Sequence, residues 1–194
     1  AGDVAESMEK LEGTLRQFRE AYDDVFYVVG NHDLWLQGAD QRDGGDSMCK
    51  LERIESMCDR IGVHTRPMLY TWGSAGTERL WIVPLLSWYH SSFDTETDIP
   101  KEQHDIPTVD RVFTDFRMCK WPGSYNALDE SLAEWFDRRN DERGCGEVPT
   151  GGNGREGYVI SFSHFLPRLE LIPEKRYLFY PHLAKAVGSQ ALGR

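Results

Sequence analysis

Residues 25–33 read Val-Phe-Tyr-Val-Val-Gly-Asn-His-Asp, and the rest of the chain is organised around them. The unbroken β-branched and aromatic run Val25–Val29 is typical of a strand buried on both faces in a parallel or mixed α/β sheet. Gly30 permits a sharp turn at the carboxyl end of that strand. The polar run 31–33 then supplies an amide, an imidazole and a carboxylate at the edge where open α/β sheets place their ligands. A functional edge is therefore predicted, with a polar turn after a core strand as the alternative.

Length and composition point to a single α/β domain over residues 1–194. The chain is 40% hydrophobic, and its formal net charge of −10 argues against a large nucleic-acid footprint. No apolar run approaches the roughly 18 residues of a membrane span, and no signal peptide is visible, so an intracellular, cytoplasmic protein is expected. None of the four cysteines forms a C-x-x-C pair, which indicates reduced thiols rather than a zinc knot.

An amphipathic helix is predicted over Val4–Tyr22, because apolar residues recur there at intervals of three and four. Asp3 before it is interpreted as the end of an upstream strand. Strand, helix and strand in succession make a βαβ crossover, the unit of a parallel sheet. Asp3 and Gly30 would then lie at the same edge of that sheet.

Further elements are expected downstream in the chain. A second helix is predicted from Ser47 to Ile61, with Ser47 as its cap and Gly62 at its end. The apolar segments 63–70 and 79–88 are predicted to form a hairpin. The elements expected after residue 62 are strands at 63–70, 79–88 and 158–163, helices at 128–139 and from Pro181, and loops at 91–107 and 141–157.

Polar residues thus follow three predicted strands, at Asp3, at the run 31–33 and at His164. Carboxylate, amide and imidazole groups together suit a divalent transition metal such as Mn, Fe or Zn. A carboxylate can also bridge two such ions, which bind phosphate oxygens and activate a water in two-metal phosphoesterases. His32 would project beyond the metals toward the substrate, and Asp33 beside it would orient or charge the imidazole.

Gly2-Asp3, Gly30-Asn31-His32-Asp33 and Ser163-His164, in this order, resemble motifs of the calcineurin-like metallophosphoesterase superfamily. The resemblance implies a layered sheet with flanking helices and a dinuclear metal site. It implies that Asp3 bridges the two divalent cations and that Asn31 and His164 bind the second. His32 would contact the phosphate and help the leaving group depart.

The chain departs from that pattern at both ends. The family's D-x-H motif should precede Asp3 and its G-H-x-H motif should follow His164, so the expected domain is incomplete at both ends and the metal site partial. The full-length parent is expected to be a metal-dependent phosphoesterase, and these 194 residues alone to be inactive. The second acidic position of the family's G-D motif is occupied by Glu6.

The expected substrate is a phosphorylated small molecule or phosphoprotein. His90, at the end of an apolar strand, is predicted to contact it. Trp35 is interpreted as a packing residue, with the wall of the substrate pocket as the alternative. Two other functions stay open: a catalytically silent scaffold of the same fold that binds a protein partner, and a generic α/β domain. His32 favours the enzyme, because a scaffold does not need it.

Overall fold

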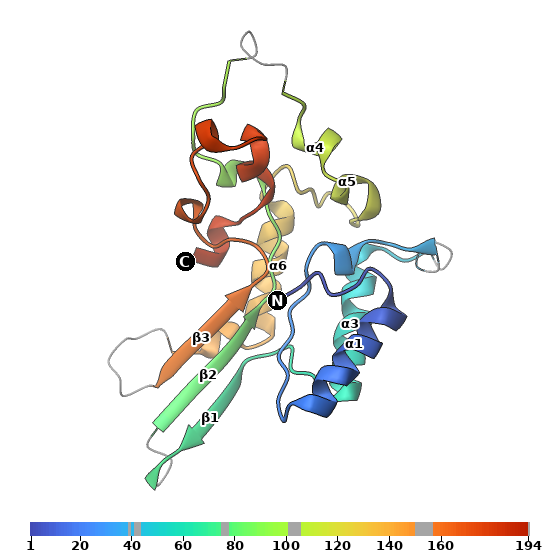
Figure 1. Cartoon of the computed structure of the whole chain (residues 1–194), viewed down its shortest axis with the longest axis vertical. Helices are drawn as coiled ribbons and strands as arrows, with labels where there is room; N and C mark the ends of the chain where they lie inside the picture. The colour runs from blue at the N-terminus through green and yellow to red at the C-terminus, as the bar shows by residue number, and fades with distance from the viewer. Residues whose placement is uncertain (39, 41–43, 75–77, 101–105, 150–156, 194) are drawn as a thin grey trace.

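The computed structural model describes residues 1–38, 40, 44–74, 78–100, 106–149 and 157–193 (Figure 1). It is a mixed α/β fold with a three-stranded sheet in the order β1-β2-β3. Strand β1 (Met68–Trp72) pairs antiparallel with β2 (Glu78–Leu85), which pairs in parallel with β3 (Tyr158–Ser163). The predicted hairpin and last strand are confirmed. The first strand of the hairpin starts just after Pro67, which has no N–H to give to a ladder.

Helices α1 (Met8–Ala21) and α3 (Ser47–Ile61) lie side by side on one flank of the molecule (Figure 1). Helix α1 begins later than predicted because the Ser7 hydroxyl accepts from the Lys10 N–H and caps it. Asp46, rather than Ser47, caps α3, and Gly62 ends it in the left-handed conformation as expected. An ion pair between Glu12 and Arg60, 2.9 Å apart, links the two helices.

The stretch Val25–Val29 is not the regular strand that the sequence predicts. Its burial is as expected, since Tyr27 to Val29 are buried. Within the described residues, however, it forms one parallel bridge, between Phe26 and His64. A strand is defined by a ladder of consecutive bonds, and the neighbouring segment runs alongside over a single residue. The predicted βαβ crossover is therefore not seen among the described elements.

The connection from β2 to β3 carries α4 (Val109–Val112), α5 (Asp115–Met118) and α6 (Ser131–Glu142). Asn140 of α6 ends strand β2, because its side-chain amide exchanges two hydrogen bonds with the backbone of Leu86, of 2.9 and 2.8 Å.

The short 3₁₀ turns are η1 (His32–Leu34), η3 (Ser91–Phe93), η4 (Cys145–Glu147), η5 (Leu169–Leu171), η6 (Lys175–Tyr177), η7 (Pro181–Ala186) and η8 (Gln190–Gly193). The predicted loops at 91–107 and 141–157 lie partly outside the described residues.

One apolar core joins the two helices, the stretch 27–29 and an aromatic group around Trp88. The indole of Trp88 packs against Trp121, Phe136 and Phe165, with ring centroids 4.7 to 5.9 Å apart. Phe165 follows His164 directly, so this packing fixes the chain on which His164 sits. Among the described helices, none is long and apolar enough to cross a membrane.

Candidate functional site

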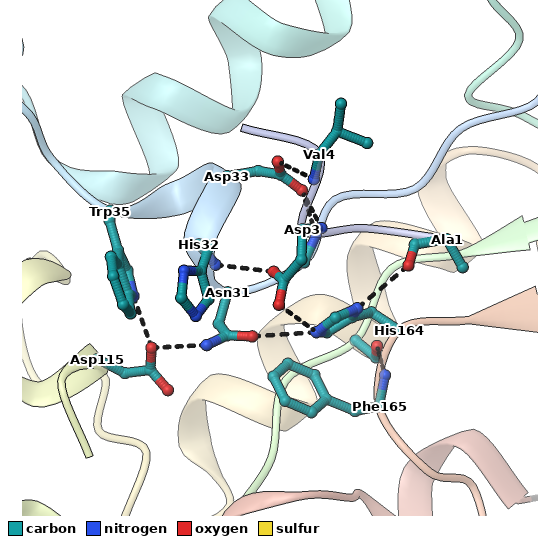
Figure 2. A network of polar contacts seen from close by, with 12 residues as sticks. Ala1, Asp3, Val4, Asn31, His32, Asp33, Trp35, Asp115, His164 and Phe165 are labelled. Atoms are coloured by element: carbon teal, nitrogen blue, oxygen red, sulfur yellow. Dashed lines mark hydrogen bonds and ion pairs between the residues drawn. The ribbon is translucent and has the colours of Figure 1, made fainter. Parts of the chain in front are cut away.

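The structure brings Asp3, Asn31 and His164 together at one point (Figure 2). The Nε2 atom of His164 lies 3.0 Å from Asn31 Oδ1 and 3.5 Å from Asp3 Oδ2. Donors about 2.1 Å from a common cation, at octahedral to tetrahedral angles, would be separated by roughly 3.0–3.4 Å. The three side chains are therefore spaced as neighbours in one coordination sphere.

Asp33 organises the loop that presents Asp3. Its fully buried carboxylate accepts four backbone N–H groups, those of Asp3, Val4, Ala5 and Gly30, at 2.7 to 3.0 Å. This differs from the predicted role in orienting His32. Residues 32–34 form a 3₁₀ turn, in which successive side chains diverge by about 120°, so the imidazole of His32 and the carboxylate of Asp33 face different ways.

The backbone at the site is crowded and unusual. Asp3 has a φ of +53°, and among the described residues it is the one non-glycine with a positive φ. A Cβ on Gly30 would lie 2.6 Å from the Asp3 nitrogen and 2.8 Å from His164 Cε1. Gly30 is thus required for the close approach of three chain segments rather than for a turn, which is a correction to the sequence-based reading. Positive φ at a non-glycine residue concentrates at functional sites.

Asp115, which the sequence reasoning missed, orients the Asn31 amide. Its buried carboxylate accepts from Asn31 Nδ2 at 2.8 Å, from Trp35 Nε1 at 2.6 Å and from the Tyr89 hydroxyl at 3.0 Å (Figure 2 shows the first two). With its nitrogen engaged there, Asn31 turns its oxygen toward His164. A carboxylate between Phe113 and Phe116 is a signal for burial that the sequence does contain.

The donor set fits a divalent cation. The other ring nitrogen of His164, Nδ1, lies 3.3 Å from the carbonyl oxygen of Ala1. If Nδ1 carries the proton and donates it there, the lone pair of Nε2 faces the acceptor oxygens of Asp3 and Asn31. In that tautomer three lone pairs face one another, an arrangement that a metal ion between them would stabilise. Within the described ranges no group of three or more His, Cys, Asp or Glu side chains is placed to hold a metal, and the Asn31 amide would be the third donor beside Asp3 and His164.

His32 stands beside these donors and is half exposed. Its ring stacks on the indole of Trp35, with centroids 3.7 Å apart, and its Nδ1 lies 3.6 Å from the Glu6 carboxylate. Its backbone N–H donates to Asp3 Oδ1 at 3.0 Å. Glu6, not Asp33, is therefore the carboxylate next to the imidazole. His32, Glu6, Asp3 and Lys10 line a cleft of about 500 Å³.

The structure does not bring His90 to this site. Strand β2 ends at Leu85, and the chain has turned away by residue 90. The His90 ring is 2% exposed, with Nδ1 2.8 Å from the Ser92 hydroxyl and Nε2 accepting from the Gln190 N–H at 3.3 Å. The predicted substrate contact is corrected accordingly: through Ser92 and Gln190 the imidazole links η3 to the C-terminal segment.

Comparisons with known proteins place this geometry in context. No family model matches the chain. It is 32% identical over 97 residues to the acyl-carrier-protein phosphodiesterase PptH of Mycobacterium tuberculosis, an alignment that covers 48% of this chain and 28% of that protein. The crystal structure of phosphopantetheinyl hydrolase (PptH) from Mycobacterium tuberculosis superposes with a TM-score of 0.66 at 22% identity, covering 97% of this chain and 63% of that one. The fold therefore resembles that of PptH, and the chain covers less than two thirds of that protein in both comparisons.

Proposed function

We propose that this chain carries the active site of a metal-dependent phosphoester hydrolase. The observation that supports this best is the convergence of Asn31 Oδ1 and Asp3 Oδ2 on His164 Nε2, with the amide held by Asp115. The likeness in sequence to PptH, which is named an acyl-carrier-protein phosphodiesterase, supports the same chemistry, and the fold resembles that of the same protein. A scaffold needs neither an exposed imidazole nor oriented metal donors beside a polar cleft.

Each residue has a role that follows from its position. Asp3, Asn31 and His164 would hold a divalent cation, with Asp3 shared with a second one. Such cations bind phosphate oxygens and lower the pKa of a bound water. His32 lies beside the donors and faces the cleft, where its imidazole contacts the phosphate and gives a proton to the departing oxygen. The Glu6 carboxylate faces Nδ1 of His32 and keeps the imidazole directed into the cleft.

A phosphodiester is the substrate class to test first, because the relative matched in sequence is named a phosphodiesterase of acyl carrier protein. A carrier protein bearing its phosphopantetheine arm is one such diester. A catalytic zinc site usually has about three protein ligands for each cation. The described residues supply only three converging donors, which is enough for one cation and too few for two. We therefore expect the 194 residues by themselves to hydrolyse phosphoesters slowly.

The test compares hydrolysis of bis(p-nitrophenyl) phosphate and of p-nitrophenyl phosphate with Mn²⁺ and with EDTA. We expect Mn²⁺-dependent cleavage of the diester that falls on the order of 10²-fold in His164→Ala. His182→Ala is the matched control, since the ring of His182 contacts the Pro107 carbonyl instead. Equal rates in the wild type and His164→Ala, or full activity in EDTA, would overturn the proposal. Loss of the arm from a holo carrier protein, followed by mass spectrometry, tests the narrower substrate.

A further inference from the structure

Lys50 is a lysine in the hydrophobic core. It lies on α3 among the buried residues of that helix and is 1% exposed. Burial lowers its pKa, although the Asp40 carboxylate, 3.6 Å away, favours the charged form. A buried ammonium is costly, and an aliphatic residue at this position would pack without that cost. The lysine is thus better explained by what its ammonium binds.

The ammonium of Lys50 joins two segments that are far apart in the chain. It donates to the carbonyl oxygen of Glu6 at 2.6 Å and to that of Trp35. Glu6 is the carboxylate beside the His32 imidazole, and Trp35 is the ring on which that imidazole stacks. Both supports of His32 are therefore attached, through their backbones, to the same nitrogen atom.

A second route runs from Lys50 to the Glu6 side chain. Asp40 pairs with Lys50 and accepts the backbone N–H of Gln37 at 2.9 Å. The side-chain amide of Gln37 in turn donates to the Glu6 carboxylate at 2.9 Å. Gln37 thus holds the Glu6 carboxylate through Oε2, while Oε1 faces His32.

The indole of Trp35 is constrained at its other end. Its Nε1 donates to Asp115, while its carbonyl accepts from Lys50. Trp35 is thus held at its backbone and at the Nε1 atom of its ring, which limits movement of the indole along the imidazole. The stack therefore depends on two buried groups, Lys50 and Asp115.

We propose that Lys50 is a positioning residue for His32: by holding the Glu6 and Trp35 carbonyls it keeps the imidazole directed into the cleft. This deepens the proposed function, on which its catalytic meaning rests. The geometric part stands by itself, since it concerns where the imidazole lies and not what it does. Lys50 touches neither the cleft nor the converging donors among its described contacts.

The test is made on Lys50→Met by NMR of the metal-free protein. In the wild type we expect cross-relaxation between the His32 ring protons and the Trp35 indole protons, and an upfield ring-current shift of the imidazole. Both should be lost in Lys50→Met. With metal and a phosphodiester, kcat should fall on the order of 10-fold to 10²-fold while KM stays within about twofold, because misplacement affects the chemical step more than binding.

Lys175→Met is the matched control. Lys175 is also buried and holds Glu96 O at 2.8 Å and Asp98 at 2.9 Å, but it lies in the C-terminal segments. The Lys175→Met variant should be less stable than the wild type, but the NMR chemical shifts and cross-relaxation of His32 should be unchanged. If Lys50→Met does not fold, Lys50→Gln, which keeps an N–H donor on a shorter arm, is measured in its place.

Unchanged His32 signals in the folded Lys50 variant, or equal changes in Lys175→Met, would overturn the positioning role. A wild type that shows the ring contact yet hydrolyses no phosphoester would instead remove the proposed function and leave the geometry standing. The two failures are therefore told apart by the same set of samples.

Discussion

Asn31 and Asp115, 84 residues apart in the sequence, are joined by a hydrogen bond of 2.8 Å from the amide nitrogen to the carboxylate. This bond decides which end of the amide faces His164. An amide left to itself can present either its oxygen or its nitrogen, and only the oxygen binds a cation. By binding the amide nitrogen of Asn31, Asp115 thus leaves the amide oxygen facing His164.

Asp115→Asn should weaken cation binding without removing any donor. The new amide can offer its own N–H to Asn31 and so allow the flipped orientation. We expect Mn²⁺ affinity, measured by titration calorimetry, to fall by 10-fold to 10²-fold, as is usual for residues that orient metal ligands. Asp110→Asn, an exposed change on the neighbouring short helix, should leave it unaltered. Equal affinities in wild type and Asp115→Asn would contradict the orienting role.

Asp33→Asn tests the structural role of the carboxylate that was expected to assist His32. Four backbone N–H groups lose a charged acceptor, so the free energy of unfolding should drop by about 3 kcal/mol or more. Urea denaturation measures it. Asp46→Asn is the control, because asparagine is as good a helix cap as aspartate and little change is expected. A stable Asp33→Asn protein with lowered kcat would instead favour the catalytic role.

Gly30→Ala should disorganise the site more than the fold. The added methyl group meets the Asp3 backbone and the His164 ring, so the three donors must separate. We expect cation binding to fall at least 10-fold. Gly13→Ala places the same methyl where no atom lies within 4 Å, inside α1, and should stabilise the protein by about 1 kcal/mol. Unimpaired binding in Gly30→Ala would show that the crowding is not needed.

His32→Ala should lower kcat on the order of 10²-fold while metal content, measured by elemental analysis, stays at the wild-type level. The imidazole lies beside the donors, not among them. Glu6→Gln should lower kcat less, because the ring keeps its stack on Trp35. Loss of metal from His32→Ala would make the residue a ligand instead.

A carboxyl at the surface gives a prediction about pH. The hydrogen bond from Lys175, with help from Lys185, lowers the pKa of Asp98 from 3.8 to about 2. A carboxyl whose pKa is lower in the folded state stabilises the protein above its unfolded pKa and loses that effect as the pH falls. The difference in unfolding free energy between wild type and Asp98→Asn should therefore be full above about pH 4 and shrink toward pH 2. A difference that is constant over this range would contradict the pairing.

The convergence of Asp3, Asn31 and His164 could be predicted because each belongs to a short motif with its own local signal. The hairpin and the last strand were equally visible, since apolar runs bounded by turn residues leave few other structures. Val25–Val29 was placed correctly in the core but not in a ladder. The residue types of a segment predict whether it is buried, whereas backbone pairing into a sheet depends on a partner segment elsewhere in the chain.

The missed features depend on direction and distance. Adjacency in sequence led to Asp33 as the partner of His32, but a 3₁₀ turn sends their side chains apart and brings in Glu6. His90 was assigned to the site from a predicted strand end at residue 88, whereas β2 ends at Leu85. Lys50 and Asp115 act through contacts 44 and 84 residues away in the sequence, and no local pattern predicts which residues they contact.

The three donors at residues 3, 31 and 164 also set an order of events during synthesis. Asp3 and Asn31 leave the ribosome early, and Asp33 can join their loops while most of the chain is still absent. His164 follows roughly ten to thirty seconds later at ordinary translation rates, and it reaches the others only when β3 has docked beside β2. The site is thus completed only after β3 has been made, although the loops of Asp3 and Asn31 are joined before it. A metal ion bound there would close the loop between residues 3 and 164, and its uptake would report that these two distant segments have met.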